Sequence, residues 1–296
     1  MGVVHVLSHA LDDAQRGDLI YGGDILVFTR VPPLAELCAL TDQLIRAEFG
    51  ELDPVRAQFA LERDEYVARV ESLQKQYRKH LAARDLFFAA LAHLGVDISR
   101  TCWDWLQLRV LPHGEAHASR RTARLDFHRD TWASNVYAQT NWWTPIYPIT
   151  AGRTISFYPV YWSSGLENTS GGWDLEEIRA RQGGGAAPTS GPVVPEPSEP
   201  VDTGAELRVV LEPGDLLCFS GAHLHAGVPN HTGVARFSVE VRTVNVDDAA
   251  SGRGAPNVDG AAPRVAFDWF RRVEDGTPLP QIITPVTSPM EDGARS

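Results

Sequence analysis

The sequence predicts a mainly β protein whose core is a sandwich or closed double sheet of the jelly-roll and cupin type, preceded by helices. From residue 101 onward, short runs of β-branched and aromatic residues recur between Gly, Pro and Asn. This spacing is typical of all-β sandwiches and barrels. Before residue 101, apolar residues recur at three- and four-residue intervals instead. That periodicity indicates amphipathic helices.

The first hundred residues are expected to be mostly helical. Pro32 and Pro33 open a helix, because proline is tolerated in the first turn. Phe59 and Tyr66 belong to a second apolar series at helical spacing, and Gly95 ends a third helix. The expected segments are a strand over 24–28 and helices over 32–49, 55–80 and 84–94.

The chain is expected to form a single domain over 1–296, with a mostly helical part over 1–100, a β core over 101–246 and a C-terminal extension over 247–296. Residues 183–204 interrupt the core with Gly-Gly-Gly and repeated Pro, Ser and Glu. This composition buries too little apolar surface to order itself. We interpret it as an irregular insertion that either closes over a site or has no role. The expected strands cover 103–110, 136–148, 153–158, 207–211, 215–219 and 235–246.

Composition and charge exclude several classes of function. The formal net charge is −11, and the basic residues form no stripe that would meet nucleic-acid phosphates. No apolar run approaches the roughly 18 residues that span a bilayer, and the N-terminus lacks a signal-peptide pattern. The three cysteines lack the spacing of a zinc site or a disulfide framework. We therefore expect a cytoplasmic protein that acts on a small molecule, without a nucleic-acid or membrane partner.

A His-x-Asp pair and a later histidine make the candidate metal site. His128 and Asp130 stand two residues apart, so a strand would point both side chains to one side. Beyond the turn at Gly214, the segment Gly221-Ala222-His223-Leu224-His225 offers two further histidines. Two histidines and one carboxylate make the facial triad that binds non-haem iron and leaves coordination positions open.

Arg236 is the candidate anion-binding residue. It shares one face of the next expected strand with Ser238. A buried arginine is costly unless it meets an anion, and a guanidinium matches a carboxylate in a two-bond geometry. Arg236 is therefore expected to bind an anion, and a carboxylate fits it best.

These motifs resemble the phytanoyl-CoA dioxygenase-like family of Fe(II)/2-oxoglutarate-dependent oxygenases. The resemblance covers roughly 101–246, and it implies a double-stranded β-helix core, with 2-oxoglutarate and O2 as co-substrates of Fe(II). It assigns the metal to His128, Asp130 and His225, and makes His223 a core residue or a support for the ligands. Arg236 would bind the distal carboxylate of 2-oxoglutarate, and Ser238 would add a hydroxyl donor. The matching motifs are His128-Arg129-Asp130, Gly214-Asp215, His225, Pro229-Asn230 and Arg236-x-Ser238.

The segment Gln139-Thr140-Asn141-Trp142-Trp143 also resembles this family. Asn141 is expected either to bond 2-oxoglutarate or the substrate, or to be an amide satisfied by the backbone of a core strand. The other candidates for contact with the substrate are Gln107, Arg109, Trp143 and Tyr161.

The resemblance implies oxidation of a C–H bond of a small metabolite, hydroxylation above all, within secondary metabolism. Asp130 speaks against halogenation, because related halogenases replace this carboxylate with a small residue. Two alternatives stay open. One is a cupin-type metal-dependent isomerase or dioxygenase that does not use 2-oxoglutarate, and the other is a non-catalytic β-sandwich binding module. The sequence leaves the substrate and the oligomeric state unknown.

Overall fold

Two β-sheets lie face to face in the computed structural model, which describes residues 2–119, 121–174 and 194–283. The larger sheet is mixed, in the order β1-β2-β8-β5-β10-β3-β11, with β4 paired to β10 beside β3. Only β1 and β2 pair in parallel among these described strands. Its strands are β1 (Val4–Leu7), β2 (Ile25–Phe28), β3 (Thr101–Trp103), β4 (Gln107–Leu111), β5 (Gln139–Pro145), β8 (Leu216–Ser220), β10 (Arg236–Asn245) and β11 (Arg271–Arg272).

The smaller sheet is antiparallel and orders its strands β7-β6-β9. Its members are β6 (Ile155–Phe157), β7 (Leu207–Val209) and β9 (His225–Gly227). Between the two sheets lies a buried apolar cluster, to which Trp143 and Phe219 contribute from the larger sheet and Phe157 from the smaller. Burial of this cluster holds the sheets together.

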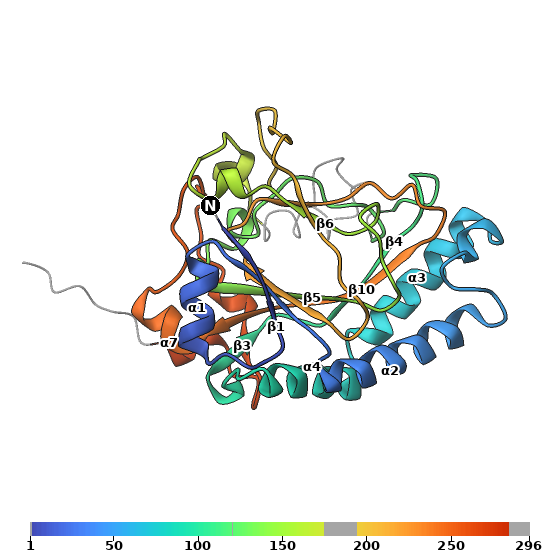
Figure 1. Ribbon diagram of the computed structural model, residues 1–296, viewed down its shortest axis with the longest axis horizontal. Helices are drawn as coiled ribbons and strands as arrows, with labels where there is room; N and C mark the ends of the chain where they lie inside the picture. The colour runs from blue at the N-terminus through green and yellow to red at the C-terminus, as the bar shows by residue number, and fades with distance from the viewer. Residues whose placement is uncertain (1, 120, 175–193, 284–296) are drawn as a thin grey trace, which may run out of the picture.

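Helices cover the face of the larger sheet that points away from β6 (Figure 1). They are α2 (Pro32–Phe49), α3 (Arg63–Tyr77) and α4 (Leu81–His93), and each buries an apolar stripe against the sheet. The other described helices are short, and they connect strands or follow them. They are α1 (Asp13–Tyr21), α5 (Thr131–Ser134), α7 (Val246–Ser251) and α8 (Leu279–Ile282), with 3-10 turns η1 (Ala57–Phe59), η2 (Ile98–Arg100), η3 (Pro159–Trp162), η4 (Thr169–Gly172) and η5 (Phe267–Trp269).

Strand β10 has one apolar and one polar face. Phe237, Val239 and Val241 point into the core under the helices. Successive strand residues point to opposite faces. The alternate residues Arg236 and Glu240 line the cavities on the other side of the sheet. One strand therefore anchors the helical layer and supplies the polar wall between the sheets.

The sequence located most of these elements, with three corrections. The helix predicted over 55–80 is η1 followed by α3, which begins only at Arg63, and Phe59 is 57% exposed instead of buried. The run predicted over 103–110 breaks into β3 and β4. The N-terminal β1 and α1 were not predicted, although Asp12 and Gln15 form a capping box at the start of α1.

Part of the predicted insertion over 183–204 lies outside the described residues. The part from 194 to 204 contains no helix or strand except a single bridge at Pro197. The C-terminal extension is described as far as residue 283, and within it β11 adds to the edge of the larger sheet beside β3.

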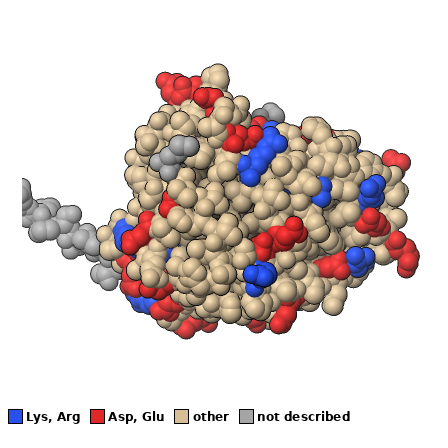
Figure 2. All heavy atoms as spheres, in the orientation of Figure 1, with Lys and Arg blue, Asp and Glu red and all other residues tan. Residues whose placement is uncertain are grey.

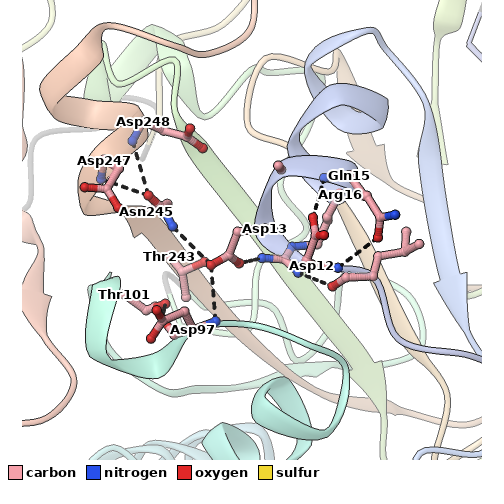
Figure 3. A network of polar contacts seen from close by, with 12 residues as sticks. Asp12, Asp13, Gln15, Arg16, Asp97, Thr101, Thr243, Asn245, Asp247 and Asp248 are labelled. Carbon is pink, nitrogen blue, oxygen red and sulfur yellow. Dashed lines mark hydrogen bonds and ion pairs between the residues drawn. The ribbon is translucent and has the colours of Figure 1, made fainter.

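A polar network fastens α1 to the region where β3 and β10 pair (Figure 3). The Asp13 carboxylate accepts hydrogen bonds from the backbone N–H of Asp97 and from the Asn245 amide, each 3.2 Å long, and pairs with Arg16. The Asn245 side-chain oxygen in turn accepts from the backbone N–H of Asp247 at 2.8 Å, which caps α7. Segments distant in the sequence are thereby held at one corner of the sheet.

Charged side chains are scattered over the face drawn in Figure 2, where positive and negative groups alternate and neither forms a broad surface. Among the described helices, none is long and apolar enough to cross a membrane.

Phe237 should be a major contributor to stability. Its ring is fully buried and lies edge-on to Phe49 and Tyr147, at centroid distances of 6.2 and 5.6 Å. Phe237→Ala is expected to lower the free energy of unfolding by about 3–5 kcal/mol, because a cavity would remain. The exposed Phe59→Ala is the matched control, with an expected change within about 0.5 kcal/mol. Urea denaturation measures both changes. Equal losses of unfolding free energy in the two variants would contradict the assignment of Phe237 to the core.

Candidate metal centre

His128, Asp130 and His225 converge between the two sheets. One possible ligand atom from each lies within 4.8 Å of those of the other two. The two imidazole rings are 4.3 Å apart, and His128 Nε2 is 3.7 Å from an Asp130 oxygen. Both histidines are buried. Two imidazoles and one carboxylate in this arrangement are the donor set of a non-haem iron site.

The backbone fixes the spacing of the two histidines. His128 and His225 form an antiparallel bridge, in which each backbone N–H donates to the other's carbonyl at 3.0 Å. Asp130 departs from the prediction, since the segment does not continue as a strand. Its backbone is helical, and it is the N-cap residue of the short helix α5. This helical turn brings the Asp130 carboxylate close to the two imidazoles. The sequence had predicted instead that a strand would point His128 and Asp130 to the same side.

Backbone carbonyls hold both imidazoles with Nε2 turned toward the centre. His128 Nδ1 donates to the Asp126 carbonyl at 2.6 Å, and His225 Nδ1 donates to the His223 carbonyl at 3.0 Å. Such hydrogen bonds fix the tautomer and the ring orientation of metal-binding histidines. Burial, and then the neighbouring His225, lower the pKa of His128 to about 3. His128 is therefore neutral and able to bind a metal at physiological pH.

Two amides and an arginine hold the Asp130 carboxylate in its ionised form. Asn141 and Gln139, which alternate along β5, both donate to one of its oxygens. The other oxygen lies 3.8 Å from the Arg242 guanidinium. Burial alone would raise the pKa of Asp130, but Arg242, the two histidines and the Asn141 amide hold it below its ordinary value.

Removing the Asn141 amide should weaken metal binding without destroying the site. Asn141→Ala leaves the Asp130 carboxylate without one of its two amide donors. We expect Ni(II) affinity to fall roughly 10–100-fold, as it does when other supporting hydrogen bonds of metal ligands are removed. Gln76→Ala removes an exposed amide from α3 and should leave the affinity unchanged. Isothermal titration with Ni(II) measures the affinity of both variants. An Asn141→Ala protein that binds Ni(II) as tightly as the Gln76→Ala protein would contradict the supporting role of Asn141.

Arg236 and Ser238 lie on the polar face of β10. Arg236 lines a small cavity together with His128, His225 and Trp143. One Arg236 nitrogen donates to the Thr154 carbonyl at 3.0 Å, whereas its Nε and the Ser238 hydroxyl are buried without a partner among the described residues. Burial lowers the pKa of Arg236 to about 10, so the guanidinium is still charged at neutral pH. A charged group with unused donors beside the triad suits an anionic ligand.

Three of the four predicted substrate contacts line a cavity of about 430 Å³ beside the triad. They are Gln107, Arg109 and Trp143. Tyr161 is not among its lining residues, and its hydroxyl accepts a hydrogen bond from the Asp202 backbone at 2.7 Å. Asn141 lines the cavity but directs its amide to Asp130, and its predicted contact with 2-oxoglutarate stays a prediction.

His223 and Arg129 stand beside the triad and support it. His223 is buried against Trp162, with ring centroids 4.5 Å apart, and only its backbone carbonyl contacts His225. Arg129 is buried and pairs with Asp259 at 3.1 Å. It also donates to the Ala222 carbonyl, and so links the two segments that carry the triad.

Sequence reasoning missed the contributions of the C-terminal extension and of Arg242. Trp269 lines the cavity, and Asp259 holds Arg129. Arg242 is tied to the buried Asp104 at 2.7 Å. The alternation of Arg236, Ser238, Glu240 and Arg242 along one strand places Arg242 on the face of the site, but no local pattern predicts its contacts with Asp104 and Asp130.

No family model and no curated protein matches the sequence. Among solved structures, the chain is similar to the non-haem monooxygenase ThoJ, at 16% identity over 74% of each chain and a TM-score of 0.43. It is also similar to EvdO2 from Micromonospora carbonacea var. aurantiaca, at 13% identity over 93% of this chain and 98% of the other, with a TM-score of 0.44. A third is the epimerase SnoN, solved with Fe3+, alpha ketoglutarate and nogalamycin RO, at 13% identity, 75% and 79% coverage and a TM-score of 0.38.

Proposed function

We propose that the chain is a non-haem iron(II) oxygenase that uses 2-oxoglutarate and O2 to hydroxylate a C–H bond of a small metabolite. The observation that carries the proposal is a His-Asp-His triad whose two histidines line a small cavity together with Arg236, a half-buried cation without an ion pair among the described residues. In the same proposal, the two sheets form the double-stranded β-helix core. The cytoplasmic location, the single domain and a role in secondary metabolism remain predictions.

One set of residues would bind the metal, and another would bind the co-substrate. His128, His225 and Asp130 would hold iron on one side and leave positions for a chelating 2-oxo acid and O2. Iron with 2-oxoglutarate supplies the oxidation: CO2 leaves, succinate forms, and one oxygen atom enters the substrate. Arg236 and Ser238 would bind the distal carboxylate of 2-oxoglutarate. Because the Asp130 carboxylate would be one of the metal ligands, hydroxylation is favoured over halogenation.

Apolar rings pack against His225 and reduce the polarity around the triad. Phe157 stacks on His225 at a centroid distance of 6.0 Å, and Phe219 lies edge-on to the same ring at 5.2 Å. Trp143 lines the small cavity together with His128, His225 and Arg236, and the Arg236 guanidinium lies 5.6 Å from its ring. A dry site strengthens every charge interaction within it.

Anaerobic absorption spectroscopy tests the proposal. Fe(II) alone should give no visible band, and a weak charge-transfer band should appear only when 2-oxoglutarate is also present. Iron binding without that band would favour a cupin-type enzyme that does not use 2-oxoglutarate, with Arg236 holding the substrate. Failure to bind iron at all would favour a non-catalytic module.

A further inference from the structure

The larger cavity beside the triad is lined by an excess of positive charge. Its volume of about 430 Å³ is in the range of sites for small organic ligands. Although the protein carries a formal net charge of −11, four arginines and only two carboxylates line this cavity. The arginines are Arg78, Arg109, Arg121 and Arg242, and the carboxylates are Asp130 and Glu240.

Two of these arginines are already paired. Arg109 pairs with Glu240 at 2.7 Å, on neighbouring strands β4 and β10. Arg242 pairs with Asp104 and lies near Asp130. Both guanidinium groups are therefore already neutralised by carboxylates of the protein itself.

Arg78 and Arg121 have no carboxylate partner among the described residues. Arg78 follows the last residue of α3, and Gln74, one turn earlier, donates to the Arg121 carbonyl at 3.2 Å. Both arginines are exposed, so they lie where the cavity meets solvent. Partial burial of the Arg78 side chain, and then the charge of Arg121, lower the pKa of Arg78. An anion bound between them would relieve this repulsion.

Three half-buried tryptophans from separate segments line the same cavity: Trp105, Trp173 and Trp269. The Arg78 guanidinium lies 5.6 Å from the Trp105 ring, which places an aromatic surface next to the free cation. Trp173 and Trp269 meet nearly edge-on at 6.4 Å. The indole N–H of Trp173 is buried and has no acceptor among the described residues. Aromatic walls of this kind suit a flat, unsaturated ligand.

We propose that the substrate is a planar aromatic or conjugated acid, whose carboxylate binds Arg78 and Arg121 while its ring system lies against Trp105, Trp173 and Trp269. Its uncharged end then faces His128, Asp130 and His225. The inference deepens the proposed function and rests on it for the reaction. The binding preference itself depends only on the residues of this cavity.

A pair of matched probes tests the preference. 2-Naphthoate and 2-naphthamide have the same ring and nearly the same shape, but only the first is charged. Isothermal titration is performed anaerobically on the Fe(II) protein with saturating 2-oxoglutarate, so that Arg236 is already occupied. We expect naphthoate to bind about tenfold more tightly than naphthamide, and this preference to weaken as salt is added.

Variants assign the preference to particular residues. Arg78→Gln with Arg121→Gln should remove the tenfold preference and leave naphthamide affinity within about twofold. Lys75→Gln removes one exposed positive charge from the same helix outside the cavity, and should change neither affinity. Trp105→Leu should weaken both probes, by roughly fivefold.

The outcomes separate this inference from the proposed function. Equal affinity for the two probes in the unaltered protein, or a preference that survives the double substitution, would overturn the acid site. If the charge-transfer band still forms in that case, the proposed function stands. If no band forms but the preference is present and depends on Arg78 and Arg121, the proposed function fails and the acid site stands.

Discussion

Asp130→Ala and His128→Ala are each expected to abolish measurable Fe(II) binding. Each substitution removes one of three ligands from a buried site in which no other carboxylate or imidazole completes a group of three among the described residues. The loss should exceed the roughly 10–100-fold that follows removal of a supporting hydrogen bond. Anaerobic titration with Fe(II) measures it.

Asp126→Ala is the matched control for these variants. Asp126 belongs to the same segment, and its half-exposed carboxylate pairs with Arg124 at 2.8 Å. Only its backbone carbonyl contacts His128, and the substitution leaves this group in place. Unchanged iron affinity in Asp130→Ala or His128→Ala would refute the triad. Loss of binding in Asp126→Ala would instead mean that the segment as a whole tolerates no change.

Arg236→Leu is expected to raise the 2-oxoglutarate concentration needed for half-saturation, with iron affinity unchanged. Removing one partner of a buried charge pair costs about 2–5 kcal/mol, which corresponds to roughly 30-fold or more in affinity. Titration of the charge-transfer band with 2-oxoglutarate gives the value directly, in the same sample that reports iron binding.

The control for this variant is Arg208→Gln, which removes a half-exposed arginine of β7 that pairs with Glu206. Its 2-oxoglutarate requirement should match that of the unaltered protein. If the Arg236→Leu protein needs no more 2-oxoglutarate than the unaltered protein, Arg236 does not bind the carboxylate, and Arg109 and Arg242 become the next candidates. Both line the larger cavity and both are already paired with acids.

The parts of the site that the sequence revealed are local motifs. His128 and Asp130 lie two residues apart. His225 and then Arg236 follow the turn at Gly214 and the strand after it. Most strands were also predicted, because buried strands concentrate β-branched and aromatic residues. Asp130 shows the limit of this reasoning, since a turn of α5, and not the strand period, aims its carboxylate.

The parts that could not be predicted depend on contacts between distant segments. Asp259 lies 130 positions from Arg129, and no local pattern links them. Phe59 matched a helical series, yet the helix begins after it. The strand β1 could not be predicted for the same reason. Its pairing with β2 depends on the surrounding sheet and not on the four residues of β1 alone.

The backbone bridge between His128 and His225 bears on which ion the protein carries. Main-chain hydrogen bonds set the spacing of the imidazoles, so the ligands stay in place when the ion departs. Affinity then follows the intrinsic order of divalent metals, in which Ni²⁺, Cu²⁺ and Zn²⁺ all bind more tightly than Fe²⁺. Contaminating ions would therefore displace iron from a folded protein, and activity would be lost by exchange and restored by chelation and reloading.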